Sequence, residues 1–127
     1  MKRYAFMSIL LICTVFPVFA LDKQSVSSNE RPIFYLFHSF TCIQCEEARD
    51  FVSELRERYP EIEFRILEVV KNRENQVLYT KLVQELGIQK PGVPVFVLGN
   101  SYIVGFKEGN RAKRQVVSMI KVELRQK

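Results

Sequence analysis

Hydrophobic and polar positions change their spacing along the chain, and each spacing predicts a different element. Residues 33–37 are continuously apolar or aromatic, which is typical of a strand buried on both faces. Between Ile43 and Tyr59 apolar residues recur at intervals of three and four, which predicts a helix with one buried stripe. Residues 61–69 alternate between polar and apolar side chains, which predicts a second strand.

Turn residues divide the second half of the chain into shorter elements. A polar loop is expected at residues 71–75, followed by an amphipathic helix that ends at Gly87, because glycine readily adopts the left-handed conformation after a helix. Residues 95–98 and 101–106 predict two strands, and the Gly-Asn pair between them is typical of a two-residue hairpin turn.

A final amphipathic helix is expected after Gly109-Asn110, so the predicted order is β-α-β-α-β-β-α. The first two strands are joined through a helix and should therefore be parallel, with a right-handed crossover. The last two should form an antiparallel hairpin. We therefore expect an α/β fold with a mixed four-stranded sheet and helices on both faces.

Residues 1–20 have the layout of a secretory signal peptide. Lys2 and Arg3 precede an apolar run from Ala5 to Phe16, and cleavage is expected after Ala20. The protein is therefore expected to be exported, to a periplasmic or other extracytoplasmic space. Residues 21–31 are polar and Ser-rich and predict a flexible lead-in to a domain at 32–127.

Two alternatives to cleavage remain open for this N-terminal segment. Residues 5–20 could stay as a membrane anchor, although the stretch is shorter than the roughly 20 apolar residues that span a bilayer. Lipid attachment at Cys13 is less favoured, because Ile12 is bulky where a small residue is expected. Membrane contact is expected only if the segment is uncleaved.

Composition and charge narrow the class of protein. With 127 residues, 47% hydrophobic and 26% charged, the chain has room for one globular domain and is not typical of a disordered protein. The formal charge is +5, but Lys2 and Arg3 supply two of these charges and the rest are interspersed with acidic residues. We therefore expect no nucleic-acid partner.

The chemistry of the chain is concentrated in Cys42 and Cys45. Removal of the signal peptide would leave these as the only cysteines, in a compartment where disulfides persist. Cys42 lies at the predicted start of a helix, where free backbone N–H groups stabilise a thiolate. Cys45 lies one turn further, within reach of a mixed disulfide on Cys42. This spacing favours a redox pair in which Cys42 attacks and Cys45 resolves.

A structural staple and a metal site are the alternatives to a redox pair. A disulfide across two residues closes a very short loop and stabilises the fold little. His38, the only histidine, could join Cys42 and Cys45 as a three-ligand copper or zinc site. We expect neither a metal nor another cofactor, apart from the Cys42–Cys45 disulfide itself.

Residues 32–127 resemble the thioredoxin superfamily. The resemblance rests on Cys42-Ile43-Gln44-Cys45 after the first strand, on Val93-Pro94 before the third strand, and on Gly105 in the fourth strand. It implies a cis Val93–Pro94 bond that places the Val93 backbone beside the cysteines, where an extended substrate segment could pair with it. Thr41, Ile43 and Gln44 complete the substrate surface that the resemblance implies.

The chain departs from the family pattern at several positions. Thr41 replaces the usual tryptophan, as in many glutaredoxins, and Leu36 occupies the position of a buried aspartate proton acceptor. Gly105-Phe106 stands where glutaredoxins have a Gly-Gly pair that helps to hold glutathione. Glu68 is considered as a substitute acceptor, but its reading as a solvated charge is preferred.

His38 also has two readings. As a cation four residues before Cys42 it would lower the pKa of that thiol. The preferred reading is a residue that terminates the strand at the surface.

The sequence therefore predicts an exported thiol–disulfide oxidoreductase that acts on protein thiols and disulfides, as a monomer. We favour a reductant recharged by a membrane electron donor, because Ile43-Gln44 includes neither proline nor histidine. The alternatives are a metal-binding or metal-delivery module, and a non-catalytic adaptor that docks partners through the rings of Phe40 and Phe106.

Overall fold

The computed structural model describes residues 30–107 and 109–127. Their elements are β1 (Ile33–His38), α1 (Ile43–Arg58), β2 (Glu63–Glu68), α2 (Arg73–Glu85), β3 (Val95–Leu98), β4 (Ser101–Val104) and α3 (Gly109–Arg125). The predicted signal peptide at residues 1–20 and nearly all of the lead-in lie outside the described residues. Within the described part of the chain, no helix is both long enough and apolar enough to span a membrane.

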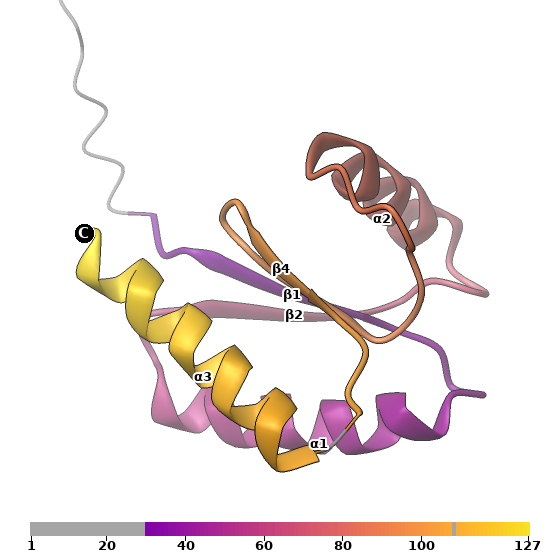
Figure 1. The fold of residues 1–127 in the computed structure, drawn as a ribbon. Helices are drawn as coiled ribbons and strands as arrows, with labels where there is room; N and C mark the ends of the chain where they lie inside the picture. Colours follow the sequence, from indigo (N-terminus) through magenta and orange to yellow (C-terminus); the bar gives the residue numbers. More distant parts are fainter. Residues whose placement is uncertain (1–29, 108) are drawn as a thin grey trace, which may run out of the picture.

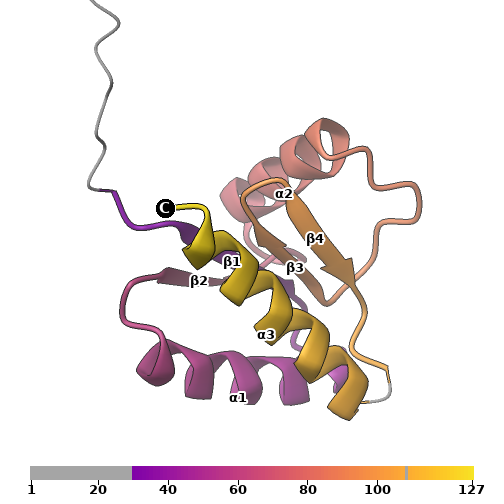
Figure 2. The same cartoon turned by 60° about the vertical axis from the view of Figure 1, so that its left-hand side comes forward.

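The strands form one sheet in the order β2-β1-β3-β4, which confirms the predicted α/β fold. β1 and β2 are parallel, whereas β1 pairs with β3, and β3 with β4, in antiparallel register. Helices α1 and α3 lie on one face of the sheet and α2 lies on the other (Figure 1). A turned view shows α3 running alongside α1 over the same face (Figure 2).

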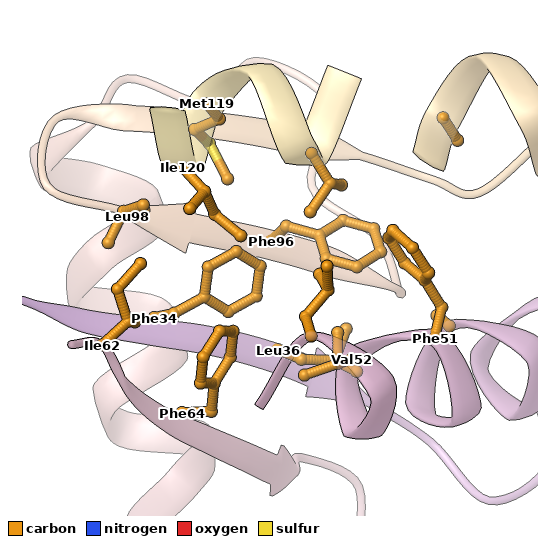
Figure 3. Close-up of a cluster of buried hydrophobic side chains, with 14 of the residues drawn as sticks. Phe34, Leu36, Phe51, Val52, Ile62, Phe64, Phe96, Leu98, Met119 and Ile120 are labelled. Atoms are coloured by element: carbon orange, nitrogen blue, oxygen red, sulfur yellow. The ribbon is translucent and has the colours of Figure 1, made fainter. Parts of the chain in front are cut away.

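Aromatic rings fill the larger core, between the sheet and the pair α1 and α3. The ring of Phe34 lies 5.1 Å from that of Phe64 and 6.2 Å from that of Phe96, centroid to centroid (Figure 3). Phe51 and Val52 close this core from α1, and Ile120 closes it from α3. The alternation of strand side chains explains the two cores, because the neighbours of Phe34 on β1 point to the opposite face.

The opposite face carries a smaller core under α2. Phe37 is fully buried there and its ring meets that of Tyr79 edge-on, at 5.3 Å between centroids. None of the residues of α2 is fully buried, so this helix covers the sheet with partly exposed side chains such as Leu78 and Leu82. β1 and β3 are thus buried on both faces, as the uninterrupted apolar run at residues 33–37 predicts.

Two predicted loop segments turned out to belong to helices. α2 begins at Arg73, inside the loop expected at 71–75, because the Asn72 side chain accepts a hydrogen bond from the Asn75 N–H at 3.0 Å and so caps the helix. Gly109-Asn110 likewise forms the first residues of α3.

Two glycines with positive φ, Gly87 and Gly105, mark the end of α2 and the end of β4. Gly87 provides the expected cap at the end of α2, with a φ of +64°. Its N–H donates a hydrogen bond to the Gln84 carbonyl oxygen, and the Ile88 N–H donates one to the Val83 carbonyl oxygen. The prediction that Gly105 lies in the fourth strand was wrong. β4 stops at Val104, because Gly105 has a φ of +85° and bends the chain away from the ladder.

Candidate active site

Cys42 caps the N-terminus of α1. Its Sγ accepts a hydrogen bond from the Cys45 N–H at 3.2 Å, and its backbone is extended, as an N-cap requires. The two cysteines form a disulfide with Cα atoms 5.1 Å apart. Cys45 is fully buried, whereas Cys42 is partly exposed. The sulfur that a solution thiol or disulfide can reach is therefore that of Cys42.

The segment before β3 lies against this disulfide. The Val93–Pro94 peptide bond is cis, and the Val93 carbonyl oxygen lies 3.8 Å from Cys42 Sγ. Pro94 is buried, and its carbonyl oxygen accepts a hydrogen bond from the Gly105 N–H at 2.7 Å. This hydrogen bond joins the bend at Gly105 to the Val93-Pro94 segment.

The other expected substrate-binding residues surround Cys42 with different exposures. Ile43 is 88% exposed and projects from the first turn of α1. Thr41 is exposed and its hydroxyl lies 2.9 Å from that of Ser39, within the turn that precedes the helix. Gln44 turns back toward the fold, because its Oε1 accepts a hydrogen bond from the Phe106 N–H at 3.4 Å. Ile43 is the member of this group most open to a partner.

His38 is buried, with 3% of its surface exposed, so the preferred reading of a surface strand terminus was wrong. It occupies the same side of β1 as Phe34 and Leu36, the side that α1 covers. Burial lowers the pKa of His38, with Arg49 acting in the same direction and Glu68 opposing it. A histidine held neutral in this way does not supply the cation that the alternative reading needed.

The Phe40 ring packs against the buried His38 ring, a contact that the sequence analysis did not predict. Its ring meets the His38 ring edge-on at 5.1 Å, and the Arg49 guanidinium lies 5.0 Å from the centre of the Phe40 ring. Nδ1 of His38 has no hydrogen-bond partner among the described residues. A β-strand alternation argument applied to residue 38 would have predicted the burial, because Leu36 is an obvious core residue.

Glu68 serves the loop after β2 and not the cysteines. Its carboxylate accepts hydrogen bonds from the backbone N–H groups of Val70, Lys71 and Asn72, at 2.8, 2.8 and 3.2 Å. Partial desolvation opposes the shift, but these three donors lower the pKa of Glu68 below its usual value. The carboxylate is thus a partly solvent-exposed charge, as preferred from the sequence, but it is held by the loop and is a poor proton acceptor.

Two alternatives lose support from the positions of their residues. Within residues 30–107 and 109–127, no group of three histidine, cysteine or acidic side chains could hold a metal ion, so His38, Cys42 and Cys45 do not form a ligand set. Phe106 is 2% exposed and packs against Phe51 and Phe96, so it cannot serve as a docking ring. Phe40, at 67% exposed, is the one ring of that hypothesis on the surface.

Solved structures that resemble this domain include thioredoxins. Mitochondrial thioredoxin 3 of Saccharomyces cerevisiae, in oxidised form, matches with a TM-score of 0.52 and 18% identity over 72% of this chain and 78% of its own. Fasciola hepatica thioredoxin matches with a TM-score of 0.52 and 23% identity over 72% and 83%. The domain therefore has the thioredoxin fold, as the sequence resemblance predicts.

A third similar structure comes from work on the thiol resolving mechanism of yeast mitochondrial 1-Cys peroxiredoxin via glutathione and thioredoxin systems. It matches with a TM-score of 0.53 and 18% identity, over 72% of this chain and 78% of its own. No protein-family model and no curated protein matches the sequence.

Proposed function

We propose that this protein is a thiol–disulfide oxidoreductase that reduces disulfides in protein substrates outside the cytoplasm. The observation that carries the proposal is the Cys42–Cys45 disulfide at the start of α1, with Cys42 partly exposed and Cys45 buried. A pair in which one sulfur faces solvent and the other is shielded supports a two-step exchange with a defined order. The thioredoxin fold of the described domain is consistent with that chemistry.

The proposed reaction begins from the reduced protein. The Cys42 thiolate attacks one sulfur of a substrate disulfide, which forms a mixed disulfide and releases the other substrate sulfur as a thiolate that takes up a proton. The Cys45 thiol then loses its proton and attacks Cys42 Sγ, which releases the second substrate thiol. Two electrons pass to the substrate, and the Cys42–Cys45 disulfide remains.

The first turn of α1 supplies the electrostatic part of this reaction. The Cys45 N–H points at Cys42 Sγ, and a thiolate there would lie at the positive end of a 16-residue helix. No histidine lies between the cysteines to add a second stabilising group. We therefore propose a pair near the reducing end of the scale, which must be recharged by a dithiol donor, in our proposal one in the membrane.

We propose export and the class of protein partner from the sequence. The signal-like residues 1–20 favour delivery to a periplasmic or other extracytoplasmic space, with membrane attachment only if that segment is retained. We propose that the domain works as a monomer on extended segments of partly unfolded or flexible proteins. The Val93 backbone, whose carbonyl oxygen lies 3.8 Å from Cys42 Sγ, is suited to such a segment.

Reduction of a model protein disulfide by the pre-reduced protein tests the proposal. The wild-type chain should reduce the substrate at a rate at least about 100-fold above that of Cys42→Ser, because the variant lacks the attacking sulfur. Ser101→Ala, on the hairpin away from the disulfide, is a matched control and should keep the wild-type rate. Equal rates for the wild type and Cys42→Ser would show that the cysteines do not carry out this chemistry.

A further inference from the structure

A second candidate site lies on the outer surface of α1 and α3, away from the disulfide. A groove of about 510 Å³ runs between the two helices, which lie side by side over the same face of the sheet (Figure 2). It is lined by Phe51, Glu54 and Arg58 of α1 and by Lys113, Arg114, Val117, Ser118 and Lys121 of α3. Neither cysteine nor Val93 contributes to it, so the redox chemistry does not explain it.

The groove is strongly biased toward positive charge. Four of its lining side chains are cations, and Glu54 is its one acidic residue. Among the described residues, the structure shows no ion pair for Arg58, Arg114 or Lys121, whereas Lys113 pairs with Glu47 at 3.9 Å. Three cations thus border the groove without an acidic partner in the described part of the chain.

An apolar floor lies beneath these cations. The Phe51 side chain is 6% exposed and forms part of the lining together with Val117. The ammonium of Lys113 is held 5.6 Å from the centre of the Phe51 ring. A ligand for this groove must therefore combine negative charge with an apolar part.

The chain enters the domain beside the C-terminal ends of the two helices that form the groove. The Glu30 carbonyl oxygen accepts a hydrogen bond from Lys127 Nζ at 3.0 Å, and an Arg31 guanidinium N–H donates to the Pro60 carbonyl at 3.4 Å. The first described residues therefore lie beside the C-terminal ends of α3 and α1, the ends that carry Lys121 and Arg58 of the groove lining. The 29 residues before them include the apolar run from Ala5 to Phe16.

We propose that this groove docks on the anionic phospholipid headgroups of a membrane surface. A phospholipid supplies both a negative phosphate for the cations and apolar atoms for the floor, and basic clusters next to apolar segments bind anionic lipids in this way. An acidic protein would satisfy the charges equally well. The entry of the chain at the same end, with residues 17–29 between it and the apolar run, favours the membrane for the form of the protein that retains this run.

Docking by this surface leaves the redox site open. The disulfide lies at the N-terminus of α1 and Arg58 at its C-terminus, which places them about 24 Å apart along a 16-residue helix. Cys42 and the Val93 segment thus stay accessible to protein substrates while the groove contacts lipid. This inference does not depend on the proposed reduction chemistry, and it is measured separately.

Co-sedimentation of the full chain with phosphatidylglycerol or phosphatidylcholine vesicles tests the proposal. Tighter binding to phosphatidylglycerol than to phosphatidylcholine is expected. This binding should weaken as the salt concentration rises from about 50 to about 500 mM, because dissolved ions screen the attraction between exposed charges. The double variant Arg114→Glu/Lys121→Glu should bind phosphatidylglycerol at least about 25-fold more weakly, since each of the two surface cations contributes a factor of about five.

The matched control is Arg73→Glu/Lys90→Glu, which makes the same charge change on the α2 side of the sheet. It should bind within about threefold of the wild type, because its cations lie away from the groove. Equal loss of binding in both double variants would show a general charge effect and overturn the proposal. Equal binding of both lipids, or groove-dependent binding of polyglutamate without binding to vesicles, would also overturn it.

Discussion

The Sγ atom of Cys42 lies 3.8 Å from the carbonyl oxygen of Val93, although the two residues are 51 positions apart in the chain. The contact joins the start of α1 to the segment that leads into β3. A substrate segment that pairs with the Val93 backbone would therefore hold its own sulfur beside Cys42. In this account, substrate binding and chemical attack depend on the same few atoms.

Thr41 and Ile43 form an exposed rim beside Cys42. Ile43 provides a test of how much this rim contributes to the binding of protein substrates. Ile43→Glu should slow the reduction of a protein disulfide by roughly 3- to 30-fold, because it removes an apolar contact and places a charge beside Cys42. The rate with a small aromatic disulfide should change less, because such a reagent does not cover the rim. Both rates are measured by stopped-flow absorbance.

Stability provides the control for that experiment. Ile43 is 88% exposed, so the substitution should change the free energy of unfolding by less than about 0.5 kcal/mol in urea titrations. An equal loss of rate with the protein and the small disulfide would mean that Ile43→Glu alters the thiolate itself. The rim would then have no separate part in binding.

His38 should make stability depend on pH. Its pKa in the folded protein is lowered by burial, then by Arg49, with Glu68 opposing, so the unfolded chain binds more protons below about pH 6.5. The free energy of unfolding should therefore fall as the pH falls below 6.5, with a slope under the roughly 1.4 kcal/mol per pH unit that one proton gives. Urea titrations between pH 5 and 7.5 measure it.

His38→Phe is the matched variant for that measurement, because it keeps a ring of similar size beside Phe40 and cannot titrate. Its stability should lose the His38 part of the slope between pH 5 and 6.5. Glu68 has a lowered pKa as well, but its contribution is lost only at more acid pH, as the pH falls below about 4.5. The same slope in His38→Phe and in the wild type would rule out His38 as its source.

Gly87 and Gly92 form a matched pair for testing a backbone effect. A Cβ at either position would meet no atom within 4 Å, but only Gly87 has a positive φ, of +64°. Gly87→Ala should therefore lower the free energy of unfolding by about 1 kcal/mol, and Gly92→Ala by much less. Thermal and urea unfolding measure both, and comparable losses would contradict the assignment of Gly87 to the left-handed cap.

Much of the fold could be predicted because its signals are local. The continuous apolar run of β1 and the three-and-four spacing of α1 each report burial directly, and they gave the right elements in the right order. The errors fell at two helix starts and at the end of β4. Asn72 and Gly109 read as loop residues in the sequence, because an N-cap and its first turn are polar in the same way that a loop is.

The site was less predictable because its contacts are long-range. The sequence identified Cys42 and Cys45 from their spacing, and the resemblance identified Val93-Pro94. Nothing local indicated that Gln44 would accept a hydrogen bond from Phe106, 62 residues away, or that Glu68 would be occupied by three loop amides. The prediction that His38 lies at the surface failed for another reason. A polar residue at a strand end was assumed to face solvent, whereas His38 is buried.

The central claim is that Cys42 attacks and Cys45 resolves, and one trapping experiment tests it directly. The reduced Cys45→Ser variant is mixed with a peptide disulfide, and the product is digested and located by mass spectrometry. The account predicts a stable mixed disulfide between the peptide and Cys42, because the resolving sulfur is absent. Cys42→Ser should trap little peptide, since Cys45 is fully buried. A mixed disulfide that accumulates on Cys45 in Cys42→Ser, and not on Cys42 in Cys45→Ser, would contradict the account.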